Sequence, residues 1–192
     1  MKATSELTDI TVFGARGHSL MILRGLEEYW QGRVRIRALI DDIENGFQHP
    51  GLGVPVISSE MRARGFADLP VLLTVTAPGL RRRVAERLEA EGAVLATACC
   101  PGQTHVDPDV TYGPGAVSMP WTRIGPGVNV APRAVIANGT RQRWLQIGDG
   151  AEIGVGAVVV GDVAPGARLI GNPALPLRDW VRLRRLARGQ DG

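Results

Sequence analysis

The residues best suited to hold a charged ligand lie in one short turn, Gly14–Ser19, which contains Gly17 and His18. The apolar run Ile10–Gly14 before the turn predicts a buried strand, and apolar residues then recur at helical spacing to about Gln31. A glycine turn between strand and helix exposes backbone N–H groups where partial positive charge favours a phosphate. Arg16 and His18 could add donors. The turn is not the dinucleotide fingerprint, and a bare turn of this kind is more often structural.

Two adjacent carboxylates form a second candidate cluster. Asp41 and Asp42 follow the run Arg35–Ile40, which we expect to be the second strand. Carboxylates at the end of such a strand can accept hydrogen bonds from a ribose or a base. Capping of the chain and solvation is the alternative, and the sequence leaves both open.

The first half of the chain has the element order of an α/β domain. Further strands are predicted at Val71–Val75 and Val94–Thr97, with a helix at Leu80–Glu91 between them. Strands that alternate with helices are typical of a parallel sheet with crossover helices. We therefore expect a small, doubly wound α/β domain over residues 1–102.

From residue 103 the period changes to six residues. A mostly β-branched or aromatic residue, with Val, Ala or Thr four places later, recurs at Val106, Tyr112, Ser118, Ile124, Val130, Ile136, Ile147, Ile153 and Val159. A break at Gln142–Gln146 removes one residue from the frame. A fixed six-residue period predicts a hexapeptide β-helix, here over 103–172, with turn residues at the corners of a triangular coil. Two coils precede the break and one follows. Exposed edges of such a stack favour assembly around an axis, and we expect a homotrimer.

The last segment, 173–192, predicts a basic helix that covers the final coil. Its arginines could indicate nucleic acid or a membrane, but we expect a solvated face with four apolar side chains turned inward: Trp180, Val181, Leu183 and Leu186. No apolar run approaches the roughly 20 residues of a membrane span, and the start lacks a signal peptide's apolar region. We therefore expect a cytoplasmic protein with no membrane insertion and no nucleic acid partner. Two adjacent cysteines and three scattered histidines give no spaced metal cluster, and no metal is expected.

The combination resembles one family, the sugar O- and N-acyltransferases of the sialic acid, bacillosamine and perosamine type. The resemblance covers nearly the whole chain and rests on the hexads and on the stretches Val12–His18, Leu39–Asp42, Gly161–Ala167 and Gly171–Ala174. It implies a Rossmann-like first domain, a left-handed β-helix, a trimer, and acetyl-CoA or another acyl-CoA as co-substrate without a metal. It also implies a nucleotide-linked sugar held by Gly14, Arg16, Gly17, His18, Asp41, Asp42 and Thr76, and acyl-CoA held near Glu152 and Gly154.

The sequence departs from this family at the residue that would take the proton. The family has a histidine, whose pKa suits a general base, shortly before an Ile-Gly hexad. Here Arg143 occupies that position, unless the residues around the break belong to a loop, and arginine stays charged and cannot act as a base. Two hypotheses stay open, and the catalytic residue is unknown under both. The chain is an acyltransferase with another base among His18, His105, Asp149 and Glu152, or it is an inactive relative that binds a sugar nucleotide or forms a structural trimer.

Overall fold

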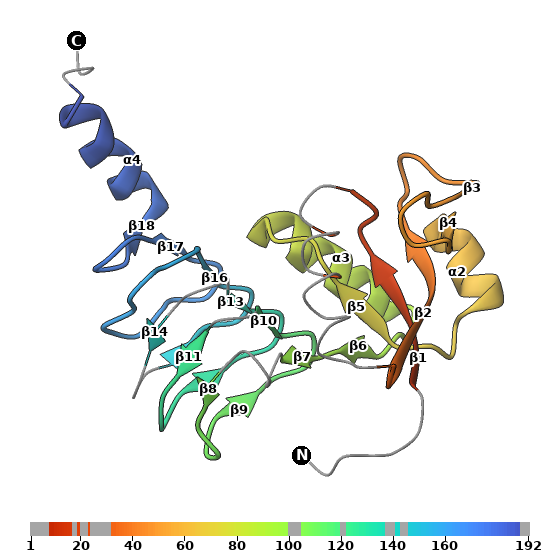
Figure 1. Ribbon diagram of the computed structural model, residues 1–192, viewed down its shortest axis with the longest axis horizontal. Helices are drawn as coiled ribbons and strands as arrows, with labels where there is room; N and C mark the ends of the chain where they lie inside the picture. Colours follow the sequence, from red (N-terminus) through yellow and green to blue (C-terminus); the bar gives the residue numbers. More distant parts are fainter. Residues whose placement is uncertain are drawn as a thin grey trace. The chain divides into compact units, whose positions relative to one another are not determined.

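The computed structural model of the chain describes residues 8–16, 19, 23, 32–99, 105–119, 122–136, 141–142 and 146–188. The chain divides into two compact units, Met1–Ala98 and Cys99–Gly192 (Figure 1). Each unit has its own hydrophobic core, one within a sheet-and-helix domain and the other inside stacked coils.

A six-stranded sheet organises the first unit. Its order is β3-β4-β2-β1-β5-β6, and its strands are β1 (Thr8–Phe13), β2 (Val34–Ile40), β3 (Phe47–Gln48), β4 (Pro55–Ile57), β5 (Val71–Leu73) and β6 (Leu95–Ala96). All neighbours pair in parallel except β3 and β4. Val12, Leu39 and Leu72 are completely buried, as expected when both faces of a parallel sheet are covered. The four predicted strands are confirmed to within two residues at each end.

Two helices are described in this unit. Helix α3 (Pro78–Ala90) matches the predicted helix and begins with proline, whose fixed φ suits the first helical turn. Its residues Val84, Ala85 and Leu88 pack against β2 and β5. The sequence did not predict β3, β4 or α2 (Ser59–Gly65), because these elements are short and α2 is mostly exposed. Most of the helix predicted up to Gln31 lies outside the described residues.

The second unit is a parallel β-helix with three stacks of short strands. One stack is β8-β11-β14, another is β9-β12-β15, and the third is β18-β17-β16-β13-β10-β7. The strands are β7 (Ala98–Cys99), β8 (His105–Val106), β9 (Thr111–Tyr112), β10 (Val117–Ser118), β11 (Arg123–Ile124), β12 (Asn129–Val130), β13 (Val135–Ile136), β14 (Arg141–Gln142), β15 (Gln146–Ile147), β16 (Glu152–Ile153), β17 (Arg168–Ile170) and β18 (Leu175–Pro176). The first residue of each predicted hexad from Val106 to Ile153 is the last residue of one of these strands, so the predicted six-residue period is confirmed.

The break in the repeat is a shortened corner inside the third coil. Gln142 pairs with Ile124 in one stack, and Ile147 pairs with Val130 in the next. The corner from β14 to β15 therefore has one residue fewer than the corresponding corner of the coil below, and the coil still closes. Arg143 and Trp144 belong to the part of this corner that lies outside the described residues.

The C-terminal helix does not cover the last coil as expected. Helix α4 (Leu177–Leu186) contacts β17 and β18, and Trp180 lies against Gly171, whose missing Cβ would be 3.2 Å from the indole ring. Beyond that turn the helix runs away from the coils (Figure 1). Leu183 and Leu186 are 53% and 51% exposed, so the expectation that they turn inward is wrong. No helix in the described part of the chain is long and apolar enough to cross a bilayer.

Candidate functional site

The first unit contains a pocket of about 400 Å³ at the carboxyl ends of its parallel strands. Its walls come from the residues that follow β1, β2 and β5 and from one side of α3. The order of the sheet reverses here, since β2 lies on one side of β1 and β5 on the other. Ligands of open α/β sheets bind in the crevice at such a reversal. The pocket brings together four residues that the sequence predicted for a ligand: Gly14, Arg16, Asp41 and Asp42.

The turn after β1 is held in place by Thr74, which follows β5. Gly14 has φ +121°, and a Cβ there would lie 2.4 Å from the hydroxyl of Thr74 and 2.5 Å from that of Ser19. The Thr74 hydroxyl donates a hydrogen bond to the carbonyl of Phe13 and lies within hydrogen-bond distance of the Ser19 hydroxyl, both at 2.8 Å. The end of β1 is therefore tied to the end of β5, and only glycine fits at this position. Gly17 and His18 lie outside the described residues.

Arg16 and Asp41, which both line the pocket, form an ion pair. The Arg16 Nε lies 3.0 Å from Asp41, and its terminal nitrogen lies 3.2 Å from Glu44. The other oxygen of Asp41 accepts hydrogen bonds from the backbone N–H groups of Ile43 and Glu44. Burial raises the pKa of Asp41. The hydrogen bonds from Glu44, Ile43 and the Arg16 guanidinium outweigh burial, so the pKa lies below the ordinary value of 3.8.

Asp42 joins the end of β2 to both described helices. Its carboxylate accepts hydrogen bonds from the backbone N–H and the hydroxyl of Ser59, at 2.8 and 2.9 Å, and from Arg87 at 2.9 Å. Arg87 also lies over the ring of Phe13, 5.5 Å from its centroid. Burial raises the pKa of Asp42, but the hydrogen bonds from Ser59 and Arg87 outweigh burial, so the pKa lies below the ordinary value of 3.8. Both aspartates thus cap the chain in this structure, the alternative that the sequence left open beside ligand contact.

The lowered pKa of Asp42 predicts a pH-dependent contribution to stability. A carboxyl group whose pKa is depressed by folding stabilises the fold above its unfolded pKa, and this stabilisation is lost as pH falls through the folded value. Because the side chain is 36% exposed, we expect about 1 kcal/mol at neutral pH. The variant Asp42→Asn should therefore unfold more easily than wild type at pH 7, and this difference should shrink below about pH 4.

Hydrogen exchange of the β2 amides across this pH range, corrected for the intrinsic exchange rate at each pH, would measure the difference within the first unit. The variant Arg87→Gln serves as the matched control, because it removes one donor to the same carboxylate and leaves those of Ser59. Its loss of stability at pH 7 should also shrink as the pH falls, but it should be smaller than that of Asp42→Asn. If the gap between wild type and Asp42→Asn stayed constant with pH, the carboxylate would not contribute through its charge.

Arg87 and Ser59 are site residues that sequence reasoning missed. They lie 45 and 17 positions along the chain from Asp42, and no local pattern links them. The only available signal was that α3 carries several arginines. Thr76, which the resemblance suggested, is partly buried in the segment after β5. That segment contributes Val75 to the pocket wall, and Thr76 is not among the lining residues.

In the second unit the proposed carboxylates are held by arginines. Glu152 lies 2.6 Å from Arg168, and Asp149 makes two contacts with Arg133, at 2.9 and 2.6 Å. These ion pairs hold neighbouring strands or corners together. His105 has its backbone in β8, and nothing further of its side chain is described. Among the described residues no three or more His, Cys, Asp or Glu side chains gather to hold a metal ion.

Gly154, the other residue suggested for acyl-CoA, has a clear packing role. A Cβ at this position would lie 3.0 Å from the carbonyl oxygen of Leu169 and 3.2 Å from the side chain of Ile170. The backbone N–H of Gly154 donates a hydrogen bond of 2.7 Å to the same carbonyl. Glycine therefore allows β17 to stack closely on the third coil.

The chain matches no family model and no curated protein, but it is similar to solved structures. One is the acetyltransferase domain of PglB from Neisseria gonorrhoeae in complex with acetyl coenzyme A, at 22% identity and a TM-score of 0.55, covering 89% of this chain and 100% of that one. Another is PerB from Caulobacter crescentus in complex with CoA and GDP-perosamine, at 21% identity and a TM-score of 0.55, covering 91% and 99%. The chain therefore has the fold of the hexapeptide-repeat sugar acetyltransferases.

Proposed function

We propose that the protein is an acyltransferase that moves an acetyl or other acyl group from acyl-CoA to an amino or hydroxyl group of a nucleotide-linked sugar. The observation that carries this proposal is the pocket at the reversal point of the parallel sheet, where Arg16 and Arg87 contribute guanidinium groups. The likeness in fold to enzymes crystallised with CoA and with GDP-perosamine supports it. We further propose that it acts in the cytoplasm.

The first unit, as a Rossmann-like domain over about residues 1–102, would hold the nucleotide. The backbone N–H groups of the segment after Gly14, which contains Gly17 and His18, would face the phosphates, since a strand-to-helix turn suits an anion. Arg16 supplies a charge-assisted hydrogen bond if its pairing with Asp41 opens. Asp41, Asp42 and Thr76 remain candidates for the ribose and base. This assignment makes Arg87 a further candidate for the phosphates.

The second unit, as a left-handed β-helix over 103–172, would hold acyl-CoA along its coils, near Glu152 and Gly154, with 173–192 as a C-terminal helix. A homotrimer would place such a groove between copies, and Val155 and Val160, which are 61% and 78% exposed, offer apolar surface for that contact. Light scattering should then report a mass three times the 20.5 kDa of one chain.

The reaction requires one proton to leave the acceptor. The nitrogen or oxygen of the sugar attacks the thioester carbonyl, the new C–N or C–O bond forms, and the C–S bond breaks to release the CoA thiol. Asp149 and Glu152 are each held by an arginine, so neither is a free base in this arrangement. His18 and His105 therefore remain the candidates for removing the proton.

A second candidate function is binding of a nucleotide sugar without catalysis. Arg143 stands where the family has its histidine, and both nearby carboxylates are paired. A trimer that binds a nucleotide sugar without turning it over would fit these facts. Binding without release of thiol distinguishes this function from the first.

The experiment is to incubate the protein with acetyl-CoA and a panel of UDP-, GDP- and dTDP-linked amino sugars and to follow free thiol. Ile43 is 86% exposed and lines the pocket, so Ile43→Glu adds a negative charge there without disturbing the core. We expect this variant to raise the KM for the nucleotide sugar at least about tenfold, with the KM for acetyl-CoA unchanged.

The matched control is Val94→Glu. Val94 is 67% exposed in the same unit but is not part of the pocket wall, so this variant should behave like wild type. Thiol release that is absent with every sugar, together with calorimetric binding of one of them, would favour the binding protein. If Ile43→Glu and Val94→Glu gave equal kinetics, the nucleotide sugar would not bind in this pocket.

A further inference from the structure

The C-terminal helix presents an apolar surface that its own chain leaves uncovered. No residue of α4 is buried, and Leu183 and Leu186 are each more than half exposed. Residues three apart are neighbours on a helix, so these two leucines form one patch. Trp180 anchors the start of the helix against Gly171 and leaves the rest projecting from the coils (Figure 1).

The same helix is strongly basic, and most of its arginines have no carboxylate partner in the part of the chain that the structure describes. Residues 177–188 contain one acidic residue, Asp179, and five arginines: Arg178, Arg182, Arg184, Arg185 and Arg188. Arg178 lies 3.7 Å from Asp179. Within the described residues, no carboxylate pairs with the other four. This differs from the described strands of the first unit, where Arg35 and Arg37 both pair with Asp9.

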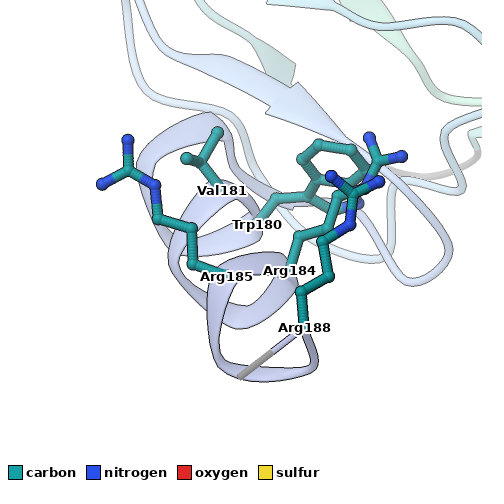
Figure 2. Close-up of a pocket in the computed structure, with 5 residues that line it drawn as sticks. All are labelled: Trp180, Val181, Arg184, Arg185 and Arg188. Atoms are coloured by element: carbon teal, nitrogen blue, oxygen red, sulfur yellow. The ribbon is translucent and has the colours of Figure 1, made fainter. Parts of the chain in front are cut away.

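The arginines also gather around a hollow on the helix. A cavity of about 240 Å³ is lined by Trp180, Val181, Arg184, Arg185 and Arg188. Figure 2 shows the guanidinium groups of Arg184 and Arg188 on the same side as the Trp180 indole, and Arg184 lies 4.9 Å from the ring centroid. Unpaired guanidinium groups of this kind suit phosphate oxygens.

An apolar patch beside several arginines on one helix favours one kind of partner. Contact between the helices of two copies would be repulsive, because each copy carries the same five arginines and a single aspartate over residues 177–188. A nucleic acid would neutralise the arginines but would leave the leucine patch in water. The surface of a bilayer with anionic phospholipids satisfies both features, because the arginines meet headgroup phosphates while the two leucines enter the boundary with the acyl chains.

We propose that α4 is a peripheral docking site for an anionic phospholipid membrane. The helix lies in the interface without crossing it, with Leu183 and Leu186 toward the acyl chains and Arg184, Arg185 and Arg188 at the phosphates. The contact is independent of the proposed acyl transfer and would hold even for a protein without turnover.

Flotation with vesicles tests the proposal on the full chain. One set contains phosphatidylcholine alone, and the other contains phosphatidylcholine with about one-third phosphatidylglycerol, which supplies the negative surface potential. We expect wild type to bind the anionic vesicles only, and to bind them less as salt rises. The double variant Arg185→Glu, Arg188→Glu should lower the vesicle affinity at least about tenfold.

Two further variants separate the contributions. Leu183→Ser with Leu186→Ser keeps every charge and should also weaken binding, because the apolar contact is lost. Arg82→Glu with Arg83→Glu makes the same change in charge on the exposed side of α3 and should bind like wild type. Circular dichroism checks that each variant is folded.

The proposal fails if wild type does not float with anionic vesicles, if it binds neutral vesicles equally, or if the Arg185→Glu, Arg188→Glu variant binds as well as wild type. Binding to a single-stranded oligonucleotide without binding to vesicles would assign the helix to nucleic acid. A lower mass of the leucine variant in light scattering, again without vesicle binding, would assign the patch to contact between copies.

Discussion

Replacing Gly14 with alanine is expected to destabilise the first unit by about 3 kcal/mol and to abolish the nucleotide-sugar binding that we propose for its pocket. Two costs combine. The φ of +121° is strained for any side chain, and the new Cβ would overlap the hydroxyls of Thr74 and Ser19 at 2.4 and 2.5 Å. These hydroxyls are bonded to each other and to β1, so they cannot move aside without breaking the link between β1 and β5.

Hydrogen exchange of the amides of β1 and β5 measures this effect within one unit, where a global melt of a two-unit chain would mix two transitions. The matched control is Gly53→Ala, since Gly53 has φ +65° and no atom within 4 Å of a Cβ; it should cost about 1 kcal/mol. Adding Ser19→Ala and Thr74→Ala to Gly14→Ala removes the overlap and should recover about half of the loss. Equal effects of Gly14→Ala and Gly53→Ala would show that backbone strain alone acts at the turn.

The regular parts of both units could be predicted from the sequence because a local period determines each of them. The hexads specify which residue enters the coil, and Ile124, Val130 and Ile136 are all buried there. The same rule could not predict the closed corner at the break, because Gln142 joins the stack through pairing with Ile124, eighteen residues earlier. Helix α4 was mispredicted for a related reason: its amphipathic pattern indicates an apolar face but not whether anything packs against it.

The candidate site divides in the same way. Gly14, Arg16, Asp41 and Asp42 follow strands, and strand ends at one edge of a parallel sheet meet, so their shared pocket could be predicted. Their partners could not. Ser59 and Arg87 come from helices whose orientation depends on tertiary packing. Their hydrogen bonds to Asp42 therefore could not be predicted from the local sequence.

Replacing Gly148 with alanine is expected to cost at least about 3 kcal/mol in the β-helix, the other large effect we predict. A Cβ at Gly148 would lie 2.4 Å from the backbone nitrogen of Pro165 and 2.8 Å from the carbonyl carbon of Ala164. The atoms in the way belong to the backbone of the next corner, and the N–H of Gly148 is bonded to the carbonyl of Val163. Stacked strands keep a spacing of about 4.8 Å, so the coil can accept a methyl group only by giving up this pairing.

A glycine two residues away provides the control for this prediction. Gly150 has φ +61° and open space around its Cβ position, so Gly150→Ala incurs backbone strain alone and should cost about 1 kcal/mol. Hydrogen exchange at Ile147 and Val163, which form an isolated β-bridge beside this corner, would report local opening. A Cβ at Gly113 would likewise lie 2.4 Å from the backbone nitrogen of Pro132, so Gly113→Ala should match Gly148→Ala. If Gly150→Ala proved as damaging as Gly148→Ala, close stacking of the corners would not be what requires glycine at this position of the coil.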